Sequence, residues 1–371
     1  MTEETILVIN AGSSSLKYAL YRADDMTQLE NKKIEIKTPA GYEAGVEEII
    51  KLIAAHNVTG VGHRVVHGGK DHSAPQKFDV ALLAELGALT PLAPLHQPHN
   101  LKAVKLIMDQ YPALPQVACF DTAFHRTQPR LNQIYALPRK LTDDGIIRYG
   151  FHGLSYEYIA SILPVKGRVI VAHLGNGASL CAMKDGKSIA TTMGFTPTDG
   201  LMMGTRTGAI DPGVALHLLE QKGLTAKIVA DIFNKQSGLK GVSGLTEDVR
   251  TLLASKTPEA AEAIDLFCLY AARQAASLTV DLGGLDALVF TAGIGENSAI
   301  IRQKICAHLA HLGVKLDAAP NAANDPSIHL AGSAVQVFVI KTNEELMMAQ
   351  HTKTLIRPAP PTPATGPKTI I

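Results

Sequence analysis

The sequence predicts an α/β protein made of two similar halves, each with a mixed sheet, that face each other across a cleft. A strand-like apolar run, a turn rich in Gly, Ser and Asn, and a second apolar run occur at residues 6–17 and again at residues 169–180. Helical patterns follow both copies, and strands followed by helices, given twice, are typical of duplicated α/β folds. With 371 residues, 46% of them apolar, the chain is long enough for two or three domains.

The first half begins with the two strands of this hairpin. Short β-branched runs bounded by Gly and Ser predict strands, whereas Val46, Ile49 and Ile53, spaced by three and four residues, predict one face of a helix. We expect strands at residues 5–9, 16–21, 60–67 and 116–120, and helices at residues 42–56, 78–90 and 98–111.

The second half repeats this plan, with Asp185-Gly186 as a hairpin turn. We expect strands at residues 168–173, 179–183, 188–192, 287–291 and 335–340, and helices at residues 211–222, 225–236, 257–280, 293–312 and 343–355. The end of the chain is rich in Pro and has no pattern that could form a core, so residues 357–371 are expected to be disordered.

Charge and cysteine content exclude several classes of protein. The formal net charge is +1 at pH 7, so neither nucleic acid nor a membrane surface is expected as a partner. None of the 4 cysteines stands in a C-x-x-C pair, which fits the reduced thiols of a cytoplasmic protein better than disulfides or a zinc site. The acidic first residues run directly into a strand, so no signal peptide is expected, and no apolar run is long enough to span a bilayer.

The two hairpin turns are candidate phosphate sites, because small residues let backbone N–H groups approach an anion closely. Asn10 and His173 stand at corresponding places, each at the end of the first strand of its hairpin. One such turn would mean little, but two matched turns favour phosphate handling in both halves. Residues 293–297 lie between a strand and a helix, where either a nucleotide-contacting turn or a plain tight turn fits. No Walker-type G-x-x-x-x-G-K-[ST] motif is present.

Two arginines stand in apolar or Gly-rich surroundings: Arg64 in His-Arg-Val-Val and Arg206 in Gly-Thr-Arg-Thr-Gly. A guanidinium group buried there needs an anionic partner, which is either a structural carboxylate or an anionic substrate bound bidentately. His63 and His67 are four residues apart, but the two valines beside them favour a strand, so we do not expect this pair to bind zinc.

Two histidines and two carboxylates complete the candidates. His152 and His173 are either hydrogen-bonded core histidines or donors to transferring phosphate oxygens. Asp121 follows a strand and Glu344 begins a helix, and both could handle Mg²⁺. Alternatively, Glu344 is an acid favoured by the dipole of its helix.

Taken together, these segments resemble the acetate kinases over nearly the whole chain. The matching segments are residues 10–17, 62–69, 93–96, 120–125, 148–153, 173–179, 193–206, 290–298 and 342–346. The resemblance implies the superfamily of acetate and sugar kinases, chaperone ATPases and actin. It therefore implies two duplicated ribonuclease H-like domains that face each other across a cleft. The N-terminal domain would comprise residues 1–123 and the C-terminal helix at residues 345–356, and the C-terminal, nucleotide-binding domain would comprise residues 124–344. It also implies a homodimer and the reaction ATP + acetate = ADP + acetyl phosphate with Mg²⁺, or with Mn²⁺ in its place.

The resemblance also implies roles for individual residues. Two arginines would flank the carboxylate and the phosphoryl group, one histidine would stabilise the transition state with a second in support, and an acid would position acetate or Mg²⁺. These catalytic residues are Arg64, Arg206, His152, His173 and Asp121. The apolar pocket for the methyl group would comprise Val66, Leu95, Phe151 and Pro197. Phosphates and nucleoside would be bound by Ser13, Ser15, Lys17, Asn176, Gly177, Asp248, Arg250, Gly293, Ile294 and Asn297, and Mg²⁺ by Asn10 and Glu344.

The chain departs from the family pattern in places, although no candidate catalytic group is missing. Ala209 stands where the family usually has Asp, Gln97 and His99 replace Asn and a neighbouring Pro, and Leu154 and Tyr156 replace Thr and His. We favour direct in-line phosphoryl transfer. Two alternatives stay open: a propionate or short-chain acyl kinase, since one methylene is worth only about 1–3 kcal/mol, and a catalytically weak nucleotide-binding regulator on the same fold.

Overall fold

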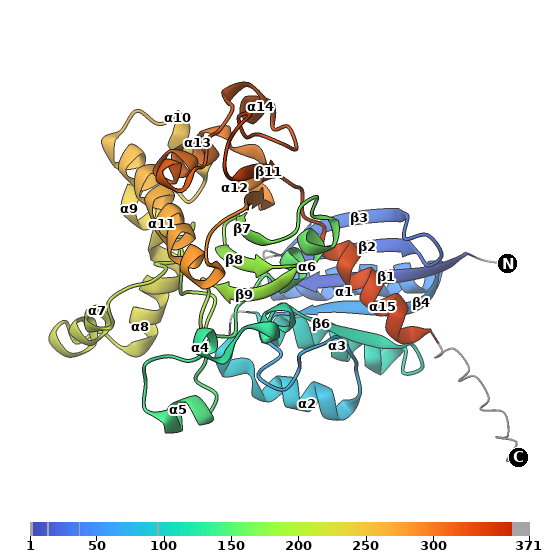
Figure 1. Ribbon diagram of the computed structural model, residues 1–371. Coiled ribbons are helices and arrows are strands. Elements are labelled where there is room, and N and C mark those ends of the chain that lie inside the picture. The colour runs from blue at the N-terminus through green and yellow to red at the C-terminus, as the bar shows by residue number, and fades with distance from the viewer. Residues whose placement is uncertain (1–2, 13–14, 37, 95, 358–371) are drawn as a thin grey trace, which may run out of the picture.

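The structure, a computed structural model, describes residues 3–12, 15–36, 38–94 and 96–357. Figure 1 shows two lobes, the first containing the blue N-terminal strands and the second containing the green strands and most of the yellow and orange helices. Two of the candidate site residues, Ser13 and Leu95, and nearly all of the tail for which disorder is expected lie outside the described residues.

The first sheet has the strand order β3-β2-β1-β4-β6-β5. Its first three strands are antiparallel, whereas β1, β4 and β6 run parallel. The strands are β1 (Glu4–Ala11), β2 (Ser15–Arg22), β3 (Gln28–Glu35), β4 (Asn57–Val65), β5 (Gln76–Lys77) and β6 (Gln116–Phe120).

The second sheet has the order β11-β10-β7-β8-β9 and repeats the first when it is read from β9. Strands β9, β8 and β7 are antiparallel, and β7, β10 and β11 run parallel. This repetition confirms the predicted duplication. The strands are β7 (Arg168–Leu174), β8 (Ala178–Lys184), β9 (Lys187–Thr191), β10 (Ala287–Thr291) and β11 (Gln336–Val339).

Helices surround both sheets. The longer ones are α1 (Pro39–Ala55), α2 (Val80–Ala88), α3 (Gln97–Gln110), α6 (Gly153–Ile162), α11 (Pro258–Leu282), α13 (Ala299–His308) and α15 (Glu344–Ile356). The shorter ones are α4 (Arg130–Gln133), α5 (Arg139–Asp143), α7 (Pro212–Leu216), α8 (Ala226–Asp231), α9 (Gly238–Ser243), α10 (Val249–Ala254), α12 (Ala292–Asn297) and α14 (Ala318–Ala323). There are also 3₁₀ turns η1 (Thr90–Leu92), η2 (Ala123–Thr127) and η5 (Ala310–Leu312), and π turns η3 (His217–Gln221) and η4 (Ile232–Gln236). Among the described residues, no helix combines the length and the apolar character that crossing a bilayer requires.

Each face of the first sheet has its own helical layer, because successive strand residues point to opposite faces. Leu7 of β1 packs in a cluster with Ile49 of α1 and Ile107 of α3. Its neighbour Ile6 packs on the other face with Met348 of α15. Helix α15, drawn in red, therefore lies against the first sheet although it ends the described chain (Figure 1).

Helix α6 lies between the two sheets. Its Leu154 packs in the cluster beneath β1 and α15, whereas Tyr156 and Ile159 pack against β7 and β8. The opposite face of the second sheet is covered by α11, whose Phe267 belongs to the large cluster that includes Ile170 of β7. Because one helix contacts both sheets, its N-terminal end is placed at the junction of the lobes.

Close packing of α15 on β4 depends on two glycines. A Cβ at Gly60 would lie 2.8 Å from the side chain of Ile356, and one at Gly62 would collide with Thr352. Only a strand without side chains at these positions lets the helix approach so closely. This approach brings the first residue of α15, Glu344, to the same strand that carries Arg64.

Most predicted elements are confirmed within a few residues, but there are differences. The helices expected at residues 211–222 and 225–236 end in the π turns η3 and η4. The helix expected at residues 293–312 breaks at Ser298, whose backbone is extended, into α12, α13 and η5. Strand β3 was not predicted because it is a largely polar edge strand, and α6 was not predicted because its apolar stripe is short. The residue boundaries of the two domains stay predictions.

Candidate active site

The ends of β4 and β6 bring a cation and a carboxylate together. Asp121 directly follows β6, and Arg64 lies near the end of β4. The Arg64 guanidinium donates from Nη2 to Asp121 Oδ2 at 2.6 Å and from Nε to Oδ1 at 3.0 Å. Its third nitrogen, Nη1, lies 3.2 Å from Oε2 of Glu344, the first residue of α15. One guanidinium group therefore joins two carboxylates from different elements.

Burial makes these charges depend on one another. Burial opposes the charge of Arg64, but the two carboxylates outweigh it and raise its pKa. Burial raises the pKa of Asp121, which is 2% exposed, although Arg64 acts against this. Burial would also raise the pKa of Glu344, but the charges of Arg64, His173 and Lys17 lower it. The site thus holds Glu344 ionised beside a permanently charged guanidinium group.

Two histidines stack beside this cluster. The ring centroids of His152 and His173 are 4.2 Å apart, and their planes differ by 16°. Burial, together with the charges of Arg64 and, for His152, of Arg206, lowers the pKa of both, to about 4 in the case of His173. Both rings are therefore neutral near pH 7.

The backbone around His152 is held in an unusual conformation. His152 has φ +60° in the left-handed region, immediately before α6 begins. The following N–H, of Gly153, donates to the carbonyl oxygen of Asp121 at 2.8 Å, and a Cβ at Gly153 would collide with that same oxygen. Such strain in a residue other than Gly is common at functional sites. This contact fixes the position of His152 relative to Asp121.

Hydroxyl groups hold the inner nitrogen of each ring. His152 Nδ1 is 2.9 Å from Ser179 Oγ, which is 2.5 Å from the hydroxyl of Tyr156. His173 Nδ1 is 2.8 Å from Ser155 Oγ, which in turn is 2.8 Å from Thr342 Oγ1. The Nδ1 atoms are thus engaged inside the protein, and the Nε2 atoms are left for the cavity.

The tip of the β7–β8 hairpin faces His152 and Arg206. A Cβ at Gly177 would lie 3.4 Å from Arg206 Nη1 and 3.5 Å from His152 Nε2. At Gly175, a Cβ would lie 4.0 Å from His173 Nε2. A cation and two ring nitrogens therefore converge on a turn whose missing side chains leave room for an anion.

Among the described residues, Arg206 differs from Arg64 in having no anionic partner. Its Nη1 donates to the carbonyl oxygen of Pro197 at 3.1 Å and lies 3.9 Å from Sδ of Met203. Within the part of the chain that the structure describes, no carboxylate lies within ion-pairing distance of it, and burial lowers its pKa. A partly buried guanidinium group that no carboxylate neutralises is suited to bind an anion from outside.

Two cavities meet at the hairpin tip. A cavity of ≈ 380 Å³ is lined by Arg64, His152, His173, Lys17 and Glu344, among others. A larger one of ≈ 930 Å³ is lined by the predicted nucleoside-side residues Asp248, Arg250, Gly293, Ile294 and Asn297. Both cavities share Gly175, Asn176 and Gly293. Their volumes lie in the range of small-molecule sites, so together they could hold a nucleotide and a reacting group.

Glu296 ties the βα turn at the mouth of both cavities to the segment before α15. Its Oε1 accepts hydrogen bonds from the backbone N–H groups of Ala292 at 2.8 Å and Thr342 at 3.1 Å. Ala292 has φ +64°, which is rare for a residue with a Cβ. The carboxylate of Glu296 therefore stabilises a strained turn. It also holds that turn beside Thr342, which lies two residues before Glu344 in the chain.

The residues predicted to bind the methyl group are only partly brought together. Val66 and Phe151 belong to one buried cluster, which also contains Ala93. Pro197 lines a separate cavity of ≈ 240 Å³ with Ala93, His96 and Arg206. Leu95, the fourth of these residues, lies outside the described residues.

Three other predicted residues take simple positions. Asn10 is paired in register with Lys17 across the β1–β2 hairpin, and Lys17 lines the same cavity as Glu344. Ser15 begins β2, and its carbonyl oxygen accepts the N–H of Gly12 at 2.8 Å. Asp248 caps α10 and pairs with Arg250, so this carboxylate has a structural role as well as lining the cavity.

The donor set fits Mg²⁺ better than zinc. Among the described residues, no group of three or more His, Cys, Asp or Glu side chains could hold a metal ion. Mg²⁺ does not need such a cage, because it is usually bound by one or two carboxylates together with substrate phosphates and water. Glu344, ionised and lining the smaller cavity, and the amide of Asn10 would supply oxygen donors of the right kind.

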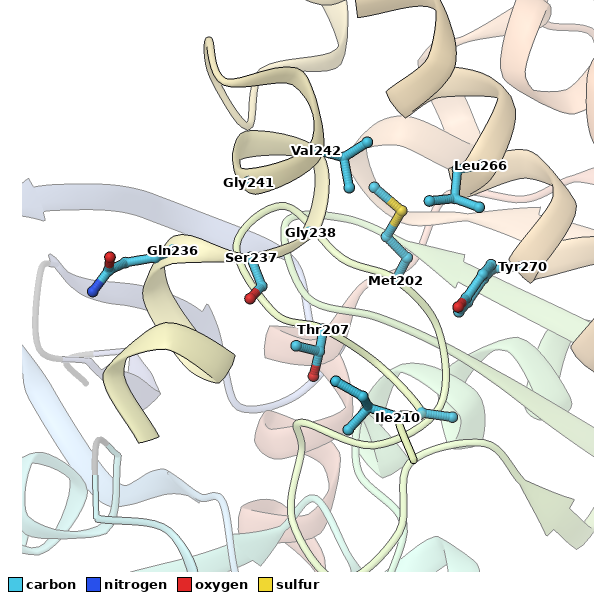
Figure 2. Close-up of a pocket in the computed structure, with 11 residues that line it drawn as sticks. Met202, Thr207, Ile210, Gln236, Ser237, Gly238, Gly241, Val242, Leu266 and Tyr270 are labelled. Carbon is cyan, nitrogen blue, oxygen red and sulfur yellow. The ribbon is translucent and has the colours of Figure 1, made fainter. Parts of the chain in front are cut away.

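A further cavity of ≈ 340 Å³ lies outside this cluster. Figure 2 shows Met202, Val242, Leu266 and Tyr270 around it, with the side chain of Gln236 turned away. None of the residues that line it is Arg, Lys, His, Asp or Glu. Since phosphoryl transfer requires charge stabilisation, this cavity is not a candidate for the reaction.

Several residues of the site were not predicted from the sequence as site residues. They are Ser155, Tyr156, Ser179, Glu296 and Thr342, and His96, whose pKa is lowered to about 4 by burial and by the charges of Arg206 and Arg64. Most of them act through a partner far away in the chain, so their own neighbours in the sequence give no signal. Glu296, inside the Gly-Ile-Gly-Glu-Asn turn, was the one that position could have indicated.

Sequence comparison assigns a family to this arrangement. A model of the acetokinase family matches residues 23–350. The chain belongs to the acetokinase family. An acetate kinase of Rhodopseudomonas palustris is 46% identical over 387 residues, covering 94% of this chain and 97% of the relative. An acetate kinase of Rhizobium meliloti is 44% identical over 388 residues, covering 95% of this chain and 98% of that relative.

Solved structures of this family share the fold. A propionate kinase from Francisella tularensis superposes with a TM-score of 0.87 at 38% identity, covering 95% of this chain and 100% of that one. The acetate kinase of Porphyromonas gingivalis has a TM-score of 0.85 at 35% identity, with the same coverage. The predicted duplicated α/β fold of the superfamily is therefore confirmed.

Proposed function

We propose that this acetokinase transfers the γ-phosphoryl group of ATP to acetate, forming ADP and acetyl phosphate, and that it also catalyses the reverse reaction. The observation that supports this most is Arg206, a partly buried guanidinium group without a carboxylate partner that lies beside His152 Nε2 and the Gly177 turn. The Gly177 turn beside it also lines the cavity that contains Arg64, His152 and Glu344.

The reaction we favour is direct in-line transfer. A carboxylate oxygen of acetate forms a bond to the γ-phosphorus while the bond from that phosphorus to the β,γ-bridging oxygen breaks, and the electron pair leaves with ADP. No proton has to move, so the protein's work is positioning and charge stabilisation. Arg206 and the Nε2–H group of His152 would contact the equatorial oxygens, and the backbone of the Gly175–Gly177 turn would hold the phosphates.

Arg64 would orient the acceptor. Its side chain is fixed by Asp121 and Glu344, so it presents a guanidinium group whose direction is already set. His173 would support His152 through the stacked rings. Asn10 and Glu344 would hold Mg²⁺, or Mn²⁺ in its place, and the bound cation would neutralise charge on the β- and γ-phosphate oxygens.

Nucleotide binding is assigned to the larger cavity. Asp248, Arg250, Gly293, Ile294 and Asn297 line it together with Asn176. It opens onto the hairpin tip at the end where phosphates would lie, and Ser13, Ser15 and Lys17 would contact the phosphates from the first lobe. Closure of the two lobes would exclude water from the transfer.

Acetate is proposed as the preferred acid, with propionate as the second candidate. The second candidate is favoured by the propionate kinase from F. tularensis, which is 38% identical to this chain. Val66, Leu95, Phe151 and Pro197 would form the apolar pocket for either acid. A catalytically weak regulator is disfavoured, because the arginines, histidines and carboxylates of the site are all present, and Arg64, His152, His173 and Glu344 line one cavity.

A hydroxamate assay tests the proposal. Purified protein is incubated with ATP, Mg²⁺ and hydroxylamine, and with acetate, propionate or butyrate in parallel reactions. We expect acyl hydroxamate with acetate at the highest kcat/KM. Absence of hydroxamate with all three acids from a folded preparation would refute the proposed function.

We further propose that the chain acts in the cytoplasm as a homodimer. The four cysteines are buried and free among the described residues, which fits a reducing compartment. Several large apolar side chains are exposed around α7, α8 and α9, namely Ile210, Val214, Leu216, Ile228 and Val242. Such a surface is typical of a subunit contact. Light scattering should give twice the monomer mass of 39.5 kDa, and a monomer at micromolar concentration would contradict the dimer.

A further inference from the structure

We propose that Tyr156 and Ser179 are positioning residues that fix the tautomer of His152, so that its Nε2 carries the proton and faces the transferring oxygens. The use of this N–H in catalysis depends on the proposed function. The tautomer itself does not, because it is set by contacts inside the protein.

The three side chains form one buried chain of hydrogen bonds. Tyr156 and Ser179 are both 0% exposed. The Tyr156 hydroxyl lies 2.5 Å from Ser179 Oγ, and Ser179 Oγ lies 2.9 Å from His152 Nδ1. Tyr156 comes from α6 and Ser179 from β8, so a helix and a strand of different packing layers meet at this serine.

The direction of these hydrogen bonds follows from counting protons. Burial raises the pKa of Tyr156 well above 10, so its hydroxyl keeps its proton. Among the described residues, the acceptor for this proton is Ser179 Oγ, since the backbone N–H of His173, which also faces the phenol oxygen, is a donor. Tyr156 therefore donates to Ser179.

Among the described residues, the hydroxyl proton of Ser179 then has one acceptor. With its oxygen accepting from Tyr156, the serine hydroxyl donates to Nδ1 of His152. Nδ1 is thereby the acceptor, and a neutral ring must carry its proton on Nε2. A proton on Nδ1 would leave one buried hydroxyl proton without an acceptor among the described residues: that of Tyr156 if Ser179 donates to it, or that of Ser179 if Ser179 accepts from both neighbours.

The free nitrogen faces the site. A Cβ at Gly177 would lie 3.5 Å from His152 Nε2 and 3.4 Å from Arg206 Nη1. Because burial and the charges of His173, Arg64 and Arg206 keep the ring neutral near pH 7, it has only one N–H group. Without a fixed tautomer, part of the population would present a lone pair to negatively charged oxygens, which repels them.

The test is a long-range ¹H–¹⁵N spectrum of the full chain labelled with ¹⁵N-histidine, recorded without substrates. The signals of His152 are identified by their loss in His152→Ala. We expect the pattern of an Nε2–H ring in the wild type, and a mixture with the Nδ1–H form in Tyr156→Phe and in Ser179→Ala. A wild-type His152 in the Nδ1–H form would overturn the proposal, whether or not either variant folds.

Kinetics supply the second readout. Tyr156→Phe should lower kcat about 10-fold, with KM for ATP and acetate unchanged within about twofold, because the N–H contact strengthens only in the transition state. The matched control is Tyr42→Phe, which also removes one buried tyrosine hydroxyl, here donating to His99 O at 2.8 Å. It should change neither kcat nor the His152 spectrum. An unchanged spectrum and unchanged kcat in Tyr156→Phe would also overturn the proposal.

The two proposals can fail separately. If the wild type makes no acyl phosphate but His152 is an Nε2–H ring, the proposed function fails and the tautomer assignment stands. If the wild type is active and His152 is an Nδ1–H ring, the tautomer assignment fails and the proposed function stands.

Discussion

Arg64 and Asp121 form a bidentate ion pair at the ends of two parallel strands, with Arg64 Nη2 2.6 Å from Asp121 Oδ2. Arg64 is in register with Cys119, so Asp121 follows β6 where the guanidinium group can reach it. The same guanidinium group also contacts Glu344. These two ion pairs give Arg64 a structural role beside the catalytic role proposed for it.

Replacing Arg64 should therefore affect stability as well as activity. Arg64→Ala leaves the buried Asp121 and the partly buried Glu344 as neighbouring carboxylates without their cation, and removal of one partner from a buried pair typically costs about 3–5 kcal/mol. We expect a lower melting temperature and activity reduced by orders of magnitude. Adding Asp121→Asn should recover part of the melting temperature without restoring activity. An unaltered melting temperature in Arg64→Ala would contradict the structural role.

Arg206 should behave differently, because no carboxylate of the described residues pairs with it. Arg206→Ala is expected to keep the wild-type melting temperature and to lose about 100-fold or more in kcat/KM, as for removal of a transition-state donor. Arg206→Lys should rescue poorly, since a point charge does not reproduce the planar fork. The control is Arg139→Ala, at an exposed position on α5, which should remain fully active. Near-normal turnover in folded Arg206→Ala would rule out this assignment.

His152→Ala should lower kcat far more than it raises KM for acetate. The ring nitrogen that faces the cavity is proposed to bind oxygens whose charge develops during transfer, so its contribution appears in the transition state. Steady-state kinetics with acetate and ATP varied separately make this measurement. A raised KM with unchanged kcat would instead assign His152 to ground-state binding.

Val66→Ala should shift preference from acetate toward propionate. Val66 is 8% exposed and packs in the same cluster as Phe151, so its truncation leaves space for one more methylene. The shift in the ratio of kcat/KM values should not exceed roughly 200-fold, the worth of a methylene in an apolar pocket. Cys268→Ala, on α11, is the control and should leave the ratio alone. If the ratio does not move with Val66, this residue does not line the pocket.

Acidification should weaken the fold through buried histidines. Burial lowers the pKa of His63 to about 4, whereas an unfolded histidine titrates near 6.5. Above about pH 6.5 His63 is neutral in both the folded and the unfolded state. Between about pH 6.5 and about pH 4 the unfolded state binds a proton at His63 and the folded state does not. The free energy of unfolding therefore decreases as the pH is lowered, by about 1.4 kcal/mol for this group at about pH 5.5.

The measurement is urea unfolding at about pH 7.5 and about pH 5.5. His63→Gln keeps a side chain that can hydrogen-bond with Gln116 but cannot titrate, so its loss of stability over this interval should be smaller than that of the wild type. His56→Gln, at an exposed position after α1, should behave as the wild type does. Equal losses in the wild type and in His63→Gln would contradict the assignment.

Local signals in the sequence were sufficient for the two hairpins. A β-branched run, a turn of small residues and a second run lie within about twenty residues, so their pairing needs no information from elsewhere. The edge strand β3 shows the limit of this reasoning. Its Gln-Leu-Glu-Asn-Lys-Lys-Ile-Glu sequence carries no apolar alternation, and it forms a strand because β2 offers it a partner.

The contacts within the candidate site could not be predicted from the sequence. Arg64 and Arg206 both indicated the need for an anion, yet the sequence alone does not distinguish an arginine that Asp121 neutralises from one that remains unpaired. That distinction depends on the β4–β6 register and on α15 reaching β4 from the far end of the chain. The same is true of Tyr156, whose partner Ser179 lies 23 residues away on another element.

The most direct test of the account follows the oxygen atoms of acetate. The enzyme is mixed with ATP, Mg²⁺ and acetate carrying ¹⁸O in both carboxylate positions, and the products are observed by ³¹P NMR. Direct transfer predicts ADP and acetyl phosphate in equal amounts, with the phosphorus signal of acetyl phosphate shifted by one bridging ¹⁸O. Formation of AMP and pyrophosphate, or of inorganic phosphate without acetyl phosphate, would contradict phosphoryl transfer to a carboxylate.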